Sequence, residues 1–467
     1  MPDFSDAQGF VYDAASPRDY HRITAIFSVD RPGAVANEFE TDYSDLGEPV
    51  ASHLSFDRLA SGYIAAKRQF PRVLDRRDLD VDSLHVRVPH VGQLQAARLW
   101  ILGLPHGAVV VAVTVEITCD VVECIALMEA LHHKRFSICG RDPFEAICEL
   151  ASPGTQQLLR DAVFGVDVHQ ILFVAGSSVG AIIDADSGAP RTEQIANLIY
   201  RYKGSYRDHA ASDLRIFYPP EANRGSETLA AAGPYVAVLA GQQGYIENAF
   251  FVSAVQMLGA TALLRRVRIE TYDELLRLRR LTTDQARDPR RERTQLAVMS
   301  ERLGKLELEL SFGVEAHERI GSLLPSLRVI DYHHAIFCAG DMPAEAATVG
   351  RMLDRLGRII QAELEGVRVR ERMSDERRRL VGSIALGSLY IIALPLGIIC
   401  GFFGINTSDV QPGSSFLDLS RYALIYGMIG LTLIVELTAI ALIFYFFKRD
   451  DARADSHRLQ IAQLNEI

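Results

Sequence analysis

Residues 380–403 read LVGSIALGSLYIIALPLGIICGFF, and these twenty-four residues include no charged side chain. A second apolar stretch, residues 422–447, reads YALIYGMIGLTLIVELTAIALIFYFF and contains one acid, Glu436. A helix needs roughly 20 apolar residues to cross a bilayer, so each stretch is long enough. Only residues 404–421 separate the two stretches. The sequence therefore predicts two C-terminal transmembrane helices joined as a hairpin, with both chain ends on one side of the lipid bilayer.

The charges that flank the two stretches predict their orientation. Three arginines, residues 377–379, precede the first stretch, and Lys448 and Arg449 follow the second. The connecting loop instead carries the acids Asp409 and Asp418. Because basic residues accumulate at cytoplasmic ends of membrane helices, we expect both termini in the cytoplasm and the connecting loop outside.

One face of the first stretch carries mainly small residues. Positions that alternate in steps of three and four share one face of a helix. Seven residues follow this spacing, namely Leu380, Ser383, Gly387, Tyr390, Leu394, Gly397 and Gly401. Small residues also let helices approach closely, and Gly397-x-x-x-Gly401 fits that rule. The spacing alone leaves two interpretations open: this face packs against another helix, or it lines a pore.

The first stretch ends in Gly404-Ile405-Asn406, with Pro395 eleven residues before the asparagine. A Gly-x-Asn tripeptide at this place, followed by a short loop and a last span with a basic flank, resembles the CorA superfamily of divalent-cation transporters. Gly-Met-Asn is usual in that family, and the Gly-Ile-Asn form is most similar to the ZntB branch, which is associated with zinc. The direct match covers about residues 340–450.

The resemblance implies a homopentameric funnel in which the first span lines the central axis. It implies that Gly404, Ile405 and Asn406 form an external selectivity ring for a divalent cation, with no other cofactor. Because Ile405 departs from the usual methionine, Mg²⁺, Zn²⁺, Co²⁺ and Ni²⁺ all remain candidates for the transported ion. Such a protein would be a multi-pass protein of the plasma membrane, the bacterial inner membrane.

Ion chemistry gives the groups of the candidate pore separate roles. Mg²⁺ holds its waters tightly, and the stripe offers no carboxylate to replace them. A ring of Asn406 amide carbonyls is expected to hydrogen-bond to the hydrated ion without trapping it. Rings of Leu380 and Leu394 are expected to gate the pore by dewetting. Asp409 either concentrates cations at the pore mouth or is an ordinary solvated acid.

Acidic residues at two further places in the chain are relevant to ion transport and its regulation. Glu436 lies within the second apolar stretch, where an acid is costly and therefore suggests a function. It either makes a structural hydrogen bond, which the peripheral place of the second span in the family favours, or couples transport to protons, as proposed for the ZntB-like branch. The transported ion is also a candidate regulator, and Asp354, Glu363 and Asp375 are acids of the expected stalk that could bind it.

Composition limits the rest of the chain. Its 467 residues allow two or three domains. The balance of 59 acids against 49 bases gives a net charge of −10, which disfavours nucleic acid as a partner and suits a domain that meets cations. No apolar run follows Met1, so we expect no signal peptide. The six cysteines form no paired framework, as is typical of the reducing cytoplasm.

Residues 83–245 predict a cytosolic α/β domain with a mixed sheet. The segments expected as strands are rich in valine and isoleucine. They cover residues 83–88, 97–104, 108–117, 169–176 and 235–241. The segments expected as helices cover residues 121–133 and 191–202. Residues 1–82 are expected to form an N-terminal extension that is partly irregular.

Long helices are expected between this domain and the membrane. Residues 246–340 predict paired helices with a break at Asp288-Pro289, and the arginine-rich run 277–280 is expected to be a solvated face. A new helix begins at 341–343 and carries a coiled-coil-like stripe of Val349, Leu353, Leu356, Ile360, Leu364 and Val367. Since no proline lies between Pro343 and Pro395, we expect a stalk helix that runs through residues 341–403 and spans roughly 90 Å. Residues 448–467 would be a cytoplasmic tail.

Three other motifs are weaker than they first look. Cys119, Cys124, His132, His133 and Cys139 lie within twenty-one residues, but a helix over 120–133 would place them on different faces, so buried cysteines are favoured over a zinc site. Asp78, Asp80 and Asp82 begin like a calcium loop, which then fails at Ser83 and Pro89, so a solvated turn is favoured. Gly176–Gly180 lacks the lysine of a phosphate loop and is expected to be a turn.

These observations favour one function and leave one alternative. No Ser-His-Asp or paired-carboxylate arrangement stands out, so we do not expect an enzyme. We expect a divalent-cation transporter or channel whose pore is formed by the first span of an oligomer. The alternative is a membrane-anchored cytosolic sensor or scaffold that transports nothing.

Overall fold

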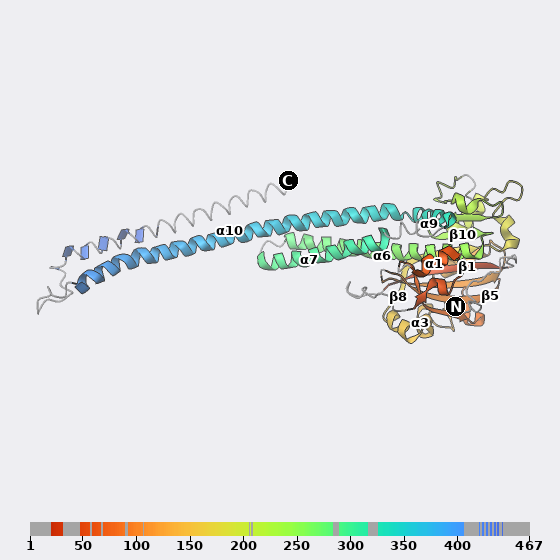
Figure 1. The fold of residues 1–467 in the computed structure, drawn as a ribbon, viewed down its shortest axis with the longest axis horizontal. Coiled ribbons are helices and arrows are strands. Elements are labelled where there is room, and N and C mark those ends of the chain that lie inside the picture. Colours follow the sequence, from red (N-terminus) through yellow and green to blue (C-terminus); the bar gives the residue numbers. More distant parts are fainter. Residues whose placement is uncertain are drawn as a thin grey trace. The chain divides into compact units, whose positions relative to one another are not determined.

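The computed structural model describes residues 20–405, apart from 31–46, 57, 67–68, 89–91, 106, 205, 207–208, 284–288 and 316–325, together with scattered positions between 420 and 441. The chain divides into two units, residues 1–362 and 363–467. Within the first unit, strands and short helices form a mixed α/β region that is followed by long helices (Figure 1). The expected combination of an α/β domain and a long helix is therefore confirmed.

Eight strands form one sheet in the order β2-β3-β5-β6-β1-β8-β10-β9. Their bounds are β1 His21–Asp30, β2 Glu48–Pro49, β3 Arg72–Leu79, β5 Gln93–Gly103, β6 Val109–Thr118, β8 Val163–Phe173, β9 Leu229–Ala232 and β10 Val236–Ala240. Neighbours are antiparallel except for the parallel pair β8 and β10, so the sheet is mixed, as expected. A separate two-stranded sheet joins β4 (Leu84–Val86) to β7 (Phe136–Ile138).

Strand β1 lies in the middle of the large sheet, so residues 21–30 belong to the α/β domain and not, as was expected, to a separate, partly irregular extension over residues 1–82. It pairs with β6 on one side and with β8 on the other, and residues 21–28 are all buried. Arg22, Thr24 and Ser28 alternate with apolar residues and place polar groups on one buried face of the strand. This polar–apolar alternation is itself the sequence pattern of a half-buried strand. The domain boundary expected at residue 83 therefore cuts through the sheet.

Two helices cover one face of this sheet. Helices α2 (Cys124–His132) and α5 (Thr192–Tyr200) share a buried apolar cluster with the strands, so both helices expected in this domain are confirmed. Gln170 of β8 donates from its side-chain amide to the Met128 carbonyl of α2 at 2.8 Å, which fixes the helix on the sheet. The remaining short helices are α1 Arg58–Ala66, α3 Pro143–Leu150, α4 Pro153–Leu159, η4 Val50–Ser52, η5 Val81–Ser83, η6 Gly176–Ala181 and η7 Pro220–Asn223.

Helix α6 (Gly244–Thr283) contacts the strands β1, β6 and β8 and the helix α9 (Leu327–Ala339). Among the described residues it is the helix that is long and apolar enough to cross a membrane, but 89% of its most apolar window is buried inside the protein. A helix that is apolar all round is either a membrane span or a core helix, and this burial identifies α6 as a core helix. The two spans expected over 380–403 and 422–447 are not shown, because many of their side chains lie outside the described residues.

A buried ion pair joins α6 to the centre of the sheet. Arg22 of β1 donates from Nη2 to Glu247 Oε2 of α6 at 2.9 Å, and the two side chains are 1% and 4% exposed. The guanidinium carbon also lies 3.9 Å from the centre of the Phe173 ring. Burial lowers the pKa of Arg22, and the neighbouring Glu247 carboxylate opposes that shift. Because an unpaired charge would be costly here, the pair defines how α6 is placed on β1.

The helices after α6 follow the expected pattern. Helix α7 (Pro289–Leu310) begins at the proline that was expected to break the helical region, and it continues into the π-helical turn η8 (Ser311–Glu315). Proline lacks a backbone N–H and is well suited to the first position of a helix, which explains the new start. An added Cβ at Gly357 would lie 3.2 Å from Leu303 Cδ2, so α7 packs closely against the next long helix, α10.

Helix α10 runs without interruption from Met342 to Ile405 and contains 64 residues. The expected continuous helix over 341–403 is therefore present, and at about 1.5 Å per residue it is roughly 95 Å long. Five residues of the expected apolar stripe are buried, namely Val349, Leu353, Leu356, Ile360 and Val367, while Leu364 is partly exposed. The stripe thus belongs to the part of α10 that packs within the protein.

Gly241, between β10 and α6, is expected to tolerate no side chain. Its φ is +63°, and an added Cβ would lie 2.1 Å from the Glu227 carbonyl oxygen. Gly241→Ala should therefore lower the free energy of unfolding by about 1–3 kcal/mol, measured by denaturant titration. Gly154→Ala is the control, because nothing lies within 4 Å of a Cβ at that position. Equal free energies of unfolding in the two variants would contradict the expectation.

Candidate functional site

The expected pore-facing residues lie along the C-terminal part of α10. Leu380, Ser383, Gly387, Tyr390 and Gly397 are exposed, and an added Cβ at either glycine would meet nothing within 4 Å. Leu394 and Gly401 lie in the same helix, and Gly404 and Ile405 end it. Asn406, Asp409 and Glu436 lie outside the described residues. Since the helix is continuous, its 3-4 spacing places the stripe along one face, as expected.

Exposure of this segment is not limited to the stripe. Leu386 is 70% exposed and Val381 is 56% exposed, although neither belongs to the stripe, whose Tyr390 is 69% exposed. A helix that is apolar all round and unpacked in its own chain needs lipid or other protein around it. The segment therefore requires surroundings that one copy of the chain does not supply among its described residues.

Two hydroxyl groups in the apolar stretches are satisfied within their own helices. Ser383 Oγ donates to the Leu380 carbonyl at 2.8 Å, and Thr438 Oγ1 donates to the Ile434 carbonyl at 2.6 Å. A hydrocarbon environment offers no water to a hydroxyl, so internal partners of this kind are needed there. Both residues are therefore compatible with a bilayer.

Two of the five residues in the sequence cluster of cysteines and histidines come together, and a third residue joins them. One potential ligand atom from each of His21, Cys119 and Cys124 lies within 4.8 Å of the others. His132, His133 and Cys139 are not part of this group. The expectation that a helix over 120–133 would separate the five residues therefore holds for His132, His133 and Cys139, but it is wrong for Cys119 and Cys124, whose sulfur atoms lie together. The sequence offered no signal for His21, because it lies 98 residues from Cys119 and inside the unrecognised strand β1.

Hydrogen bonds hold this group in place. The Ala175 backbone N–H donates to His21 Nδ1 at 3.1 Å, so His21 Nε2 carries the proton and donates to the Cys119 carbonyl, also at 3.1 Å. Burial lowers the pKa of His21 and keeps its ring neutral. The two sulfur atoms are 3.6 Å apart, and a hydrogen bond from Cys124 lowers the pKa of the Cys119 thiol. The same interaction, together with burial, raises the pKa of Cys124.

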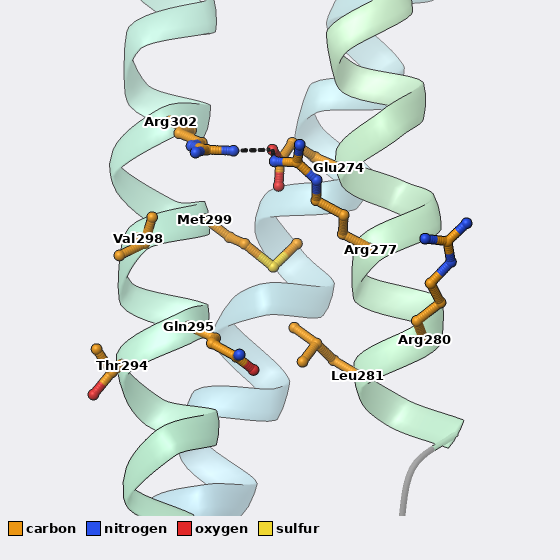
Figure 2. A pocket seen from close by; sticks show the side chains of 9 residues that line it. All are labelled: Glu274, Arg277, Arg280, Leu281, Thr294, Gln295, Val298, Met299 and Arg302. Atoms are coloured by element: carbon orange, nitrogen blue, oxygen red, sulfur yellow. Dashed lines mark hydrogen bonds and ion pairs between the residues drawn. The ribbon is translucent and has the colours of Figure 1, made fainter. Parts of the chain in front are cut away.

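A pocket of about 360 Å³ lies between α6 and α7 (Figure 2). Leu281, Val298 and Met299 give it apolar walls. At one end, Glu274 Oε1 accepts hydrogen bonds from Arg277 and from Arg302, the latter at 2.9 Å. Arg277 is half exposed, as expected for a solvated run, whereas Glu274 beside it is buried. The excess of arginine disfavours this pocket as a cation site.

The other two motifs are local structure. Asp80 caps the short helix η5 by accepting from the Asp82 backbone N–H at 3.2 Å, and Asp78 forms an ion pair with Arg98. Gly176–Ala181 forms the 3₁₀ helix η6. The expectations of a solvated turn in place of a calcium loop, and of a turn in place of a phosphate loop, agree with this geometry.

The described elements form a mixed α/β domain, which is followed by the core helix α6, by the helices α7 and α9, and by the very long helix α10. The C-terminal end of α10 is apolar and exposed. No protein-family model, curated protein or solved structure matches this chain.

Proposed function

We propose that this protein transports a divalent metal cation through a pore that several copies of α10 enclose. The observation that carries the proposal is the single uninterrupted helix from Met342 to Ile405. One end of that helix packs within the α/β unit, and the other carries the exposed stripe and stops immediately before Asn406. A rigid helix of this kind can transmit a change in a cytosolic domain to the selectivity ring.

The chemistry of the apolar end supports a pore in a bilayer. Its exposed leucine, valine and tyrosine side chains suit lipid or a neighbouring helix, and the Ser383 hydroxyl donates to a carbonyl of its own helix. One hairpin cannot enclose an ion path, so several copies must supply the wall. The Gly404-Ile405-Asn406 sequence then presents one amide per copy to the ion. Carbonyl dipoles stabilise a cation without holding it permanently, as conduction requires.

Uptake into liposomes tests the proposal directly. Purified protein is reconstituted, and the entry of Mg²⁺, Zn²⁺, Co²⁺ and Ni²⁺ is compared with protein-free liposomes. Transport of at least one of these ions is expected, and the ranking identifies the preferred metal. If none enters faster than in protein-free liposomes, the alternative of a membrane-anchored sensor or scaffold is favoured.

The oligomeric state gives a separate expectation. We expect the detergent-solubilised protein to be an oligomer, because a stripe on one face of α10 needs several partners to surround an axis, and the resemblance to the CorA superfamily implies five copies. Native mass measurement of the intact complex checks this. A monomer or a dimer would reject the pore, since neither can enclose a path with one face per chain.

A further inference from the structure

We propose that the α/β domain binds one thiophilic divalent cation of the Zn²⁺ class between Cys119, Cys124 and His21. The three residues belong to different elements: His21 begins β1, Cys119 follows β6, and Cys124 begins α2. The sheet brings them together, because His21 pairs with Ile117 in the register of β1 and β6. One ligand atom from each residue lies within 4.8 Å of the others.

The two sulfur atoms are spaced for a shared metal ion. Cys119 Sγ and Cys124 Sγ are 3.6 Å apart. Zinc–sulfur bonds of about 2.3 Å at a tetrahedral centre place two thiolate sulfurs roughly 3.8 Å apart. The thiols therefore need to move very little. Binding deprotonates both of them and releases two protons, so the affinity must fall as the pH is lowered.

The loop between the cysteines is fixed before any ion arrives. Asp120 Oδ1 accepts from the Val122 backbone N–H at 2.9 Å, and Glu123 Oε2 accepts from the Asp120 backbone N–H at 3.2 Å. These bonds hold the entry to α2 and therefore the position of Cys124. The same two carboxylates bring negative charge close to the sulfur of Cys119, which favours a cation there.

His21 completes the donor set by exchanging one hydrogen bond. Its Nδ1 carries the lone pair, which now accepts from the Ala175 backbone N–H. A metal ion at Nδ1 replaces that amide, while Nε2 keeps its bond to the Cys119 carbonyl. A backbone acceptor on the second ring nitrogen is typical of metal-ligating histidines. Two thiolates and one imidazole leave one position of a tetrahedral ion for water, so we expect a reversible site.

Occupancy of this site does not depend on the proposed transport. The site belongs to the unit formed by residues 1–362, whereas the candidate selectivity ring is Asn406. An Asn406→Ala variant should therefore give the same thiolate-to-metal absorption with Co²⁺ as the wild type does. Binding without uptake would leave this inference standing while the proposed function fails, and uptake without binding would do the reverse.

Cobalt titration tests the donor set in the full-length protein. The protein is kept reduced with a phosphine and titrated with Co²⁺, then with Zn²⁺. We expect one Co²⁺ per chain with strong thiolate-to-metal absorption that Zn²⁺ removes. Cys119→Ser and Cys124→Ser should lose that absorption and weaken Zn²⁺ binding by more than about 100-fold, and His21→Gln by at least about 10-fold. Cys148→Ser is the matched control, because this half-buried cysteine lies on α3 outside the group.

A second measurement uses only the wild-type protein, so its result does not depend on whether a variant folds. Zn²⁺ should slow alkylation of the half-buried Cys119 and leave alkylation of the exposed Cys139 unchanged. The site is overturned if the wild type gives no thiolate absorption with Co²⁺, or if Zn²⁺ does not protect Cys119. It is also overturned if Cys148→Ser loses the absorption as fully as Cys119→Ser does.

Discussion

Asn406→Ala is expected to abolish most divalent-cation flux while the oligomer still assembles. Asn406 follows directly on the last residue of α10, and its amide is the uncharged side-chain carbonyl that this place offers to an ion. Alanine removes the ring of dipoles and leaves the backbone unchanged. The measurement is the initial rate of uptake into liposomes for the ion that the wild type prefers.

Two further variants make this result specific. Asn406→Asp keeps the shape but adds one negative charge per copy, so it should retain ion binding and slow release, because clustered charges hold a divalent ion too strongly for conduction. Ser408→Ala removes a polar group two residues later in the same loop and should transport as the wild type does. Size and thermal melting establish that each variant is folded and assembled. Wild-type flux through Asn406→Ala would remove Asn406 from the proposed selectivity ring.

Loss of the Glu247 charge is expected to give the largest fall in stability. Glu247→Gln keeps the shape of the side chain but leaves the guanidinium of Arg22 buried without its counter-charge. Removing one partner of a buried pair costs about 3–5 kcal/mol, because the desolvated charge that remains is no longer compensated. Denaturant titration of the full chain, followed by the fluorescence of the buried Trp100, measures the change.

Two comparisons separate the ion pair from ordinary packing. Arg22→Met/Glu247→Leu removes both charges and should be more stable than Glu247→Gln alone, because no buried charge is left unpaired. Arg141→Gln breaks a solvent-exposed ion pair with Glu149, whose two side chains are 55% and 62% exposed, so water can replace the contact. Its cost should therefore be at most about 1 kcal/mol. Equal losses in Arg141→Gln and Glu247→Gln would contradict this interpretation.

The sequence predicted the elements whose pattern is local. Apolar runs predicted β5, β6 and β10, and the proline at 289 marked the start of α7. The absence of any proline between Pro343 and Pro395 predicted a continuous helix over this range, because a proline inside a helix removes a backbone hydrogen bond and breaks or kinks it. The stripe from Leu380 to Gly401 lies along that helix for the same reason. Its role, and the role of Asn406, stay predictions drawn from the Gly-Ile-Asn sequence.

Tertiary structure decided everything that depends on distant pairing. His21 meets Cys119 across 98 residues, and Arg22 meets Glu247 across 225. Neither pair has a sequence spacing that could reveal it, since sheet register and helix docking bring the partners together. Residues 22–29 largely alternate polar and apolar side chains, as a half-buried strand does, but only the packed structure shows that α6 also covers the polar face of β1. Likewise, α6 meets the length and hydropathy of a membrane span, and only the sheet and helix packed around it establish it as a core helix.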